Sequence, residues 1–172
     1  MTPEAADLIH QLGLLPLEAE GGYFRQTWRS ASVLPNGTPT GTCIYALQTD
    51  DPDSFSAMHR LPTDEVWHFY LGDPFGLLLL HPDGSVAEPV LGRDLAHGQH
   101  LQLVVPAGTW MGGRVEPGGS YSLFGCTMSP GFSEADYEGG LVETLARRWP
   151  NYNARIRSLV RAGGPVHMTP NA

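Results

Sequence analysis

Hydrophobic spacing divides the chain into a strand-like middle and helical ends. Over residues 2–13, apolar side chains recur at i, i+3, i+4 and i+7, the spacing of one helix face. Thr2 can cap such a helix, Pro3 suits its first turn, and Gly13 can end it. The pattern therefore predicts a short N-terminal helix whose apolar face packs on the rest of the molecule.

Between residues 21 and 132 the pattern changes to short runs rich in β-branched and aromatic residues. Segments such as Pro35-Asn36-Gly37 and His81-Pro82-Asp83-Gly84 separate the runs and have the chemistry of tight turns. Because no helical pattern intervenes, this region predicts an all-β barrel or sandwich. The expected strands lie near residues 23–28, 42–48, 66–71, 76–80, 101–105 and 121–128.

Helical spacing returns near the C-terminus. One helix is predicted over residues 141–149, before Pro150, and a last helix from Asn151 to about Gly163. We expect these helices to pack outside the β core. The whole arrangement predicts one domain over residues 1–164 and a flexible tail over 165–172.

Composition narrows the function classes. A chain of 172 residues with a net charge of −8 and only ten Lys plus Arg repels phosphate backbones, which excludes nucleic acid as a partner. The longest apolar run is too short to span a bilayer, and the N-terminus has no basic leader pattern. Cys43 and Cys126 lie in apolar segments typical of reduced, buried thiols. These features predict a soluble cytoplasmic protein whose partner is a small molecule.

The segment HRLPTDEVWHFYLG, residues 59–72, has the spacing of a metal site on a small β-barrel. Such a site needs imidazoles and a carboxylate that converge from neighbouring strands. His59 and Glu65 can supply one of each, and Gly72 closes the segment. A second segment, Pro106-Ala-Gly108-Thr-Trp110, follows on a later predicted strand.

These two segments resemble the motifs of the cupin superfamily, in outline G-x5-H-x-H-x3-4-E-x6-G and G-x5-P-x-G-x2-H-x3-N. The segments EGGYFRQTWRS, TCIYAL, SAMHRLPTDEVWHFYLG, LVVPAGTWMGG and GCTMSPGFSEADYE are similar to one branch, the fifth cupin family, long catalogued as a domain of unknown function. The resemblance covers nearly the whole chain. It implies a mainly β jelly roll (double-stranded β-helix) with the helices outside, usually as a homodimer, and it implies no established reaction.

The chain departs from the cupin metal pattern at two ligand positions. Leu61 occupies the second histidine position of the first motif, and Met111 occupies the histidine position of the second. Neither side chain replaces an imidazole for a divalent ion that prefers nitrogen and oxygen donors. With His59 and Glu65 alone, a divalent metal needs a third ligand, for which His68 and His100 are the candidates.

Strand alternation assigns faces around Glu65. Glu65, Trp67 and Phe69 share one face, which is expected to point inward, whereas His68 lies on the opposite face unless a bulge turns it. A carboxylate on an aromatic face is costly without a partner. We therefore expect Glu65 and His59 to form the polar centre of a pocket and to be the candidate catalytic pair.

Aromatic residues and one arginine are the candidate ligand-binding groups. Tyr45, Trp67, Phe69 and Trp110 can form a stacking surface for a ligand, although plain core packing explains them equally well. Arg25 can grip a carboxylate or phosphate of a ligand, or can pair with an acidic residue of the chain.

Three functions are compatible with these residues. The first is a metal-free isomerase or epimerase of sugar-like ligands, in which His59 and Glu65 move protons next to a carbonyl and Tyr45 is a third candidate for this role. Its link to metal-free epimerases of the superfamily is an analogy of fold. The second is a ligand-binding module without turnover. The third is a metal-dependent oxygenase or isomerase with a depleted ligand set.

Overall fold

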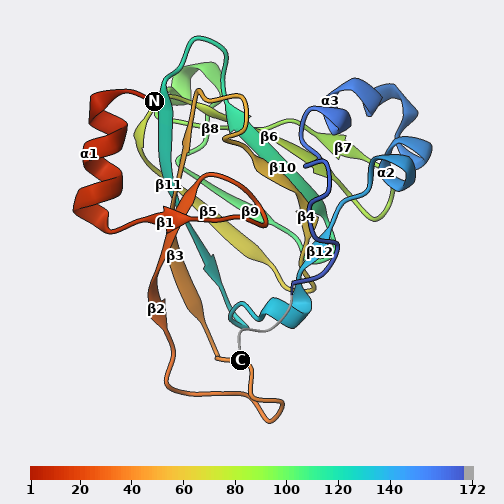
Figure 1. The fold of residues 1–172 in the computed structure, drawn as a ribbon. Helices are drawn as coiled ribbons and strands as arrows, with labels where there is room; N and C mark the ends of the chain where they lie inside the picture. Colours follow the sequence, from red (N-terminus) through yellow and green to blue (C-terminus); the bar gives the residue numbers. More distant parts are fainter. Residues whose placement is uncertain (169–172) are drawn as a thin grey trace.

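Two antiparallel β-sheets packed face to face form the body of the molecule in the computed structural model, which describes residues 1–168 (Figure 1). From edge to edge, the first sheet contains β1 (Leu15–Pro16), β2 (Tyr23–Arg29), β3 (Thr42–Thr49), β11 (Tyr121–Met128), β5 (Glu65–Gly72) and β9 (Gln102–Val105). The second contains β12 (Glu138–Gly139), β4 (Ser56–Arg60), β10 (Trp110–Val115), β6 (Phe75–Leu80) and β7 (Val86–Ala87), with β8 (Val90–Leu91) beside β6. All six predicted strands are present, each within one residue of its expected bounds. The expected mainly β fold is confirmed.

Strands β4 and β10 were not predicted from the sequence. Four of the five residues of β4, and all but Arg114 of β10, are buried, so neither strand shows the alternation that marks a half-exposed strand. His59 therefore lies on an interior strand of the second sheet, which the sequence pattern did not reveal. Its direct partners across the sheet are Met111 on one side and Gly139 on the other.

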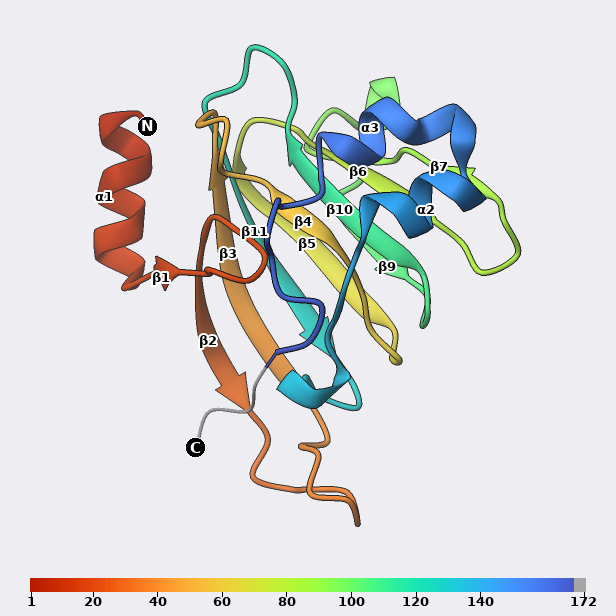
Figure 2. The ribbon, with the colours of Figure 1, turned by 45° about the vertical axis from the view of Figure 1, so that its right-hand side comes forward.

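Helices cover the outer faces of both sheets, as expected (Figure 2). Helix α1 (Pro3–Leu12) lies against the first sheet, and its cap is Thr2, whose Oγ1 accepts a hydrogen bond from the Ala5 N–H at 3.3 Å. Helices α2 (Val142–Arg148) and α3 (Asn153–Arg157) lie against the second sheet. Short 3-10 turns complete the set: η1 (Leu95–His97), η2 (Glu134–Asp136) and η3 (Pro150–Tyr152).

The last helix is shorter than predicted at both ends. The 3-10 turn η3 occupies the expected start, and α3 begins only at Asn153. At the other end α3 stops at Arg157, and the carbonyl of Leu159 accepts a 2.7 Å hydrogen bond from the Met58 N–H of β4. Within residues 1–168, no helix is long and apolar enough to cross a membrane.

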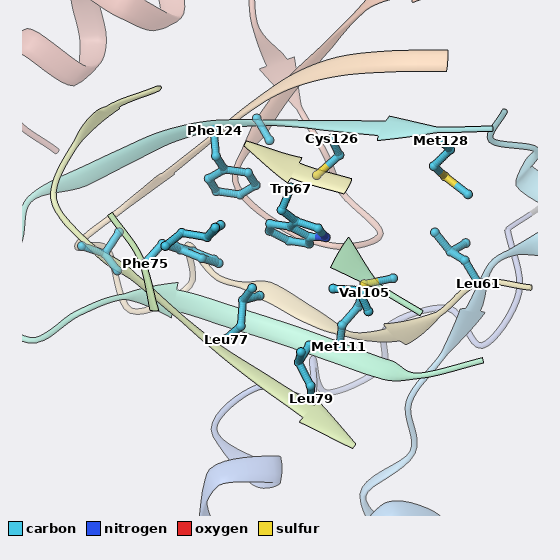
Figure 3. Packing of buried hydrophobic residues seen from close by; sticks show 13 residues of the cluster. Leu61, Trp67, Phe75, Leu77, Leu79, Val105, Met111, Phe124, Cys126 and Met128 are labelled. Carbon is cyan, nitrogen blue, oxygen red and sulfur yellow. The ribbon is translucent and has the colours of Figure 1, made fainter. Parts of the chain in front are cut away.

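The core between the sheets combines three packed aromatic rings with aliphatic and sulfur-containing side chains (Figure 3). The ring of Trp67 stacks on Phe124 at a centroid distance of 4.9 Å and on Phe75 at 6.0 Å. Leu61 and Met111, which occupy the two cupin ligand positions, are 3% and 1% exposed in the same cluster. They act as core residues and contribute no polar atom to the interior.

Candidate functional site

One large cavity, about 1010 Å³ in volume, opens on the inner face of the first sheet. Three segments outside the sheet also border it: residues 17–21, residues 132–135 and the C-terminal stretch between Arg161 and Met168. Its sheet wall is largely apolar, with Ile44, Ala46, Trp67 and Phe124 among its members. The buried polar side chains of its lining are Thr42, Gln48, Ser56, His59 and Glu65, and Glu20 lies beside His59.

Glu65 is a buried carboxyl in this wall. It begins β5 and is 6% exposed. Burial raises its pKa to about 7, while the nearby His59, the indole N–H of Trp67 and the thiol of Cys126 pull the pKa down. Trp67 Nε1 donates to Glu65 Oε2 at 2.9 Å. Burial also raises the pKa of the Cys126 thiol, which therefore keeps its proton and donates it toward the carboxylate.

His59 presents one ring nitrogen to the cavity. The residue is 2% exposed, and its Nδ1 lies 2.7 Å from the carbonyl oxygen of Ala57. Because a carbonyl only accepts hydrogen bonds, Nδ1 carries the proton in the neutral form of the ring, and in that form Nε2 has the free lone pair. The ring is held from one side by Tyr137, stacked at 5.5 Å. Nε2 faces Glu20 Oε2 at 3.7 Å, longer than a hydrogen bond.

Glu20 is the residue of this group that sequence reasoning did not select. It lies on the loop between β1 and β2, followed by Gly21 and Gly22 with φ values of 103° and 68°. A side chain on Gly21 would overlap the carbonyl oxygen of Phe55, so only glycine allows the loop to approach this closely. Gln48 Nε2 donates to the Gly21 carbonyl at 3.0 Å and fixes the loop. The sequence feature that could have pointed to Glu20 is the Glu-Gly-Gly segment, which places an acidic residue beside two glycines that let the loop approach closely.

The structure brings only part of the expected ligand-binding set to the cavity. Trp67 lines it, whereas Phe69 packs in the core without reaching the lining. Arg25 and Tyr45 lie on the outer face of the first sheet, with the guanidinium 6.0 Å from the ring centroid. Trp110, the last of the expected aromatic residues, is buried between the second sheet and the C-terminal helices. Strand register explains these placements, because it decides which face each residue occupies.

The two candidate third metal ligands lie away from His59 and Glu65. His68 is on the outer face of β5, as alternation predicted, and its Nε2 is 3.1 Å from Thr127 Oγ1. His100 is exposed and forms an isolated bridge with Leu91 beside the second sheet. Among residues 1–168, no three His, Cys, Asp or Glu side chains are grouped so that they can hold a metal ion. The donors present do not fit a divalent metal of the cupin kind.

Comparison with known proteins defines the class. Residues 6–139 match the family described as Cupin superfamily (DUF985), Cupin_5. With two antiparallel sheets and a cavity on the inner face of one of them, the fold agrees with this match. The protein is therefore a cupin, and within the superfamily it belongs to the DUF985 family.

Its relatives in this family are of unknown function. Protein SO0799 from Shewanella oneidensis superimposes with a TM-score of 0.83 at 34% identity, over 91% of this chain and 97% of that one. A hypothetical protein from Leishmania major gives 0.82 at 31% identity, over 94% and 100%. The uncharacterized protein YML079W of Saccharomyces cerevisiae is 27% identical over 69% of this chain and 66% of its own length, just under two thirds.

More distant cupins share the fold alone. Oxalate decarboxylase from Bacillus subtilis has a TM-score of 0.52 at 14% identity, and this chain covers 38% of it. Similarity at this level shows that the two proteins share a fold, and it carries no information about the reaction.

Proposed function

We propose that the cavity binds a small sugar-like molecule and moves a proton on it, as an isomerase or epimerase. The observation that carries this proposal is the pairing of Glu65, 6% exposed, with His59, 2% exposed, in the wall of one mainly apolar cavity. Buried ionisable groups in a concave site are the usual signature of acid–base chemistry.

Glu65 is suited to act as the general acid. Its pKa of about 7 means that a large fraction of the carboxyl is protonated near neutral pH. A protonated carboxyl can give its proton to the carbonyl oxygen of a ligand while the surrounding apolar wall excludes water. The hydrogen bond from Trp67 then helps to stabilise the carboxylate that remains.

His59 is suited to act as the general base. Its Nε2 lone pair can take a proton from the carbon next to the ligand carbonyl, which forms a neutral enediol as Glu65 protonates the oxygen. The hydrogen bond of Nδ1–H to the Ala57 carbonyl holds the ring, and Glu20 at 3.7 Å faces the positive charge that develops on it. An isomer forms when His59 returns the proton to the former carbonyl carbon while the Glu65 carboxylate takes the hydroxyl proton from the neighbouring carbon. An epimer forms when the enediol first turns its other face to His59, which then returns the proton to the original carbon while Glu65 recovers its proton from the oxygen.

A ligand-binding role without turnover is the second candidate. The apolar sheet wall and the cavity volume of about 1010 Å³ support binding of a small molecule whether or not a reaction follows. The two functions differ only in whether the bound molecule exchanges a proton with the solvent.

Solvent deuterium incorporation separates the two. The protein is incubated with aldose and ketose phosphates in D2O, and loss of the proton signal beside the carbonyl is followed by NMR. We expect incorporation with the wild-type protein and a loss on the order of 10² to 10⁴-fold in Glu65→Gln and His59→Gln. Glu143→Gln, on the exposed face of α2, is the matched control and should retain the full rate.

A bound ligand that exchanges no proton would instead establish the binding role. Exchange that continues unchanged in both Glu65→Gln and His59→Gln would contradict the proposed chemistry. Circular dichroism of each variant checks that a lost rate does not reflect unfolding.

A further inference from the structure

A β-bulge in β2 changes which arginine faces the cavity. The register of β2 against β3 shifts between Gln26 and Trp28. Regular alternation would place Arg25 and Arg29 on the same face. The extra residue reverses the faces, so Arg29 lines the cavity while Arg25 stays outside over Tyr45. Bulges commonly re-aim a side chain beside a functional site in this way.

Arg29 and Glu65 belong to one row across the first sheet. Arg29 is opposite Thr42, Thr42 is opposite Met128, and Met128 is opposite Glu65. All four residues line the cavity. Three strand spacings separate the ends of the row, about 14 Å along the sheet. Because both end residues line the same cavity, a small molecule can lie between the guanidinium and the carboxyl.

Within the described chain, the guanidinium of Arg29 has no hydrogen-bond or ion-pair partner. The other arginine of the lining, Arg161, is held against the protein. Its Nη2 donates to the Asp53 carbonyl at 2.8 Å, its guanidinium lies 4.8 Å from the ring of Phe55, and its buried Nε has no hydrogen-bond partner among the described residues. Of the two arginines that line the cavity, the exposed Arg29 is therefore the one whose guanidinium makes no hydrogen bond to the described chain.

We propose that Arg29 is the anion-recognition residue of the cavity and that the ligand is an acidic sugar-like molecule, carrying a carboxylate or a phosphate. The anionic group binds Arg29, and the carbonyl end lies across the cavity at His59 and Glu65. A guanidinium has the planar fork that matches both kinds of oxyanion. This inference rests on the proposed function and adds the class of substrate to it.

The acidic residues of the lining make Arg29 decisive for such a ligand. Glu18, Glu20 and Glu134 also border the cavity, and Glu18 and Glu20 disfavour an anion near them. An anionic ligand therefore needs a cationic contact to offset this repulsion, and Arg29 can supply it. Uncharged sugars gain no ionic contact with Arg29, so the cavity selects ligands by their charge.

Calorimetric titration with three probes tests the proposal: glucose 6-phosphate, glucuronate and uncharged glucose. We expect one or both charged probes to bind the wild-type protein more tightly than glucose, and the stronger of the two tells phosphate from carboxylate. Arg29→Ala should weaken that probe at least about tenfold, the loss of one charge-assisted hydrogen bond. Arg25→Ala removes the same charge from the other face of the same strand and should change the affinity less than twofold.

Three results would overturn the proposal: no binding of either charged probe to the wild-type protein, equal binding of glucose, or an equal effect of the two alanine variants. Arg29→Lys tests whether the planar guanidinium contacts the ligand, since lysine keeps the positive charge but cannot make two parallel hydrogen bonds to an oxyanion. An affinity between those of the wild type and Arg29→Ala supports a direct contact. The proposed function is tested separately. If Glu65→Gln abolishes deuterium exchange while Arg29→Ala leaves binding intact, the acid–base role stands and the anion site fails.

Discussion

The indole N–H of Trp67 donates a 2.9 Å hydrogen bond to the carboxyl of Glu65, its neighbour two positions earlier on the inner face of β5. A single strand thus supplies both the buried acid and a group that stabilises its ionised form. The thiol of Cys126, on the adjacent strand β11, supplies a second such bond. Against these, burial is the stronger effect and keeps the pKa high.

Removing the indole donor should raise the pKa of Glu65 above about 7. Trp67→Phe keeps an aromatic ring in the stack with Phe124 but deletes the N–H that favours the carboxylate. The pKa is measured by ¹³C NMR titration of the labelled carboxyl. Trp110→Phe, in a separate cluster beyond the second sheet, is the control and should leave the titration unchanged. An unchanged or lower pKa in Trp67→Phe would show that this hydrogen bond does not act on Glu65.

Glu65 should make the folded protein less stable as the pH rises from acid to neutral. The folded pKa is about 7 against 4.5 for an unperturbed carboxyl, so between these values the folded state holds a proton that the unfolded state has lost. The stabilisation from this group is therefore complete below pH 4.5 and is lost as the pH rises through about 7. The change amounts to roughly 3 kcal/mol.

Urea denaturation over this pH range measures the effect. Glu65→Gln cannot ionise, so we expect its free energy of unfolding to lack the decline and to exceed that of the wild type at alkaline pH. Glu143→Gln, at an exposed position, should follow the wild-type curve. Parallel curves for the wild type and Glu65→Gln would contradict a raised pKa.

The close approach of the loop that carries Glu20 to Phe55 and His59 depends on Gly21. Gly21→Ala and Gly84→Ala both place a side chain at positive φ, 103° and 93°, a cost of about 1 to 2 kcal/mol each. Only at Gly21 would the added atom also overlap Phe55 and Arg161, whereas Gly84 faces open space. We expect Gly21→Ala to lose more stability in urea denaturation and to slow deuterium exchange, because Glu20 is displaced from His59. Equal losses and an unchanged exchange rate in the two variants would refute this role.

Strand alternation correctly predicted which residues of β5 face the interior of the molecule. It placed Glu65 and Trp67 on the inner face and His68 on the outer face, and the register of β5 against β11 agrees. The cupin resemblance then supplied the fold and the significance of Leu61 and Met111. These features could be predicted because they depend on local periodicity and on motif spacing.

Other features depend on tertiary contacts and were missed. The strand that carries His59 is buried on both sides and shows no alternation. Arg29 was passed over in favour of Arg25 because a bulge reverses the alternation within β2, and a bulge has no reliable signature in a single sequence. Glu20 approaches His59 through a loop, whose path local pattern does not determine.

The pH dependence of solvent deuterium incorporation tests most directly whether Glu65 donates a proton to a bound ligand. We expect the wild-type rate to fall about tenfold per pH unit above a midpoint near 7, as the carboxyl loses its proton. In Glu65→Gln the residual rate should be low and should show no such midpoint. A wild-type rate that stays constant well above this midpoint, or the same decline in Glu65→Gln, would contradict the assignment of Glu65 as the acid.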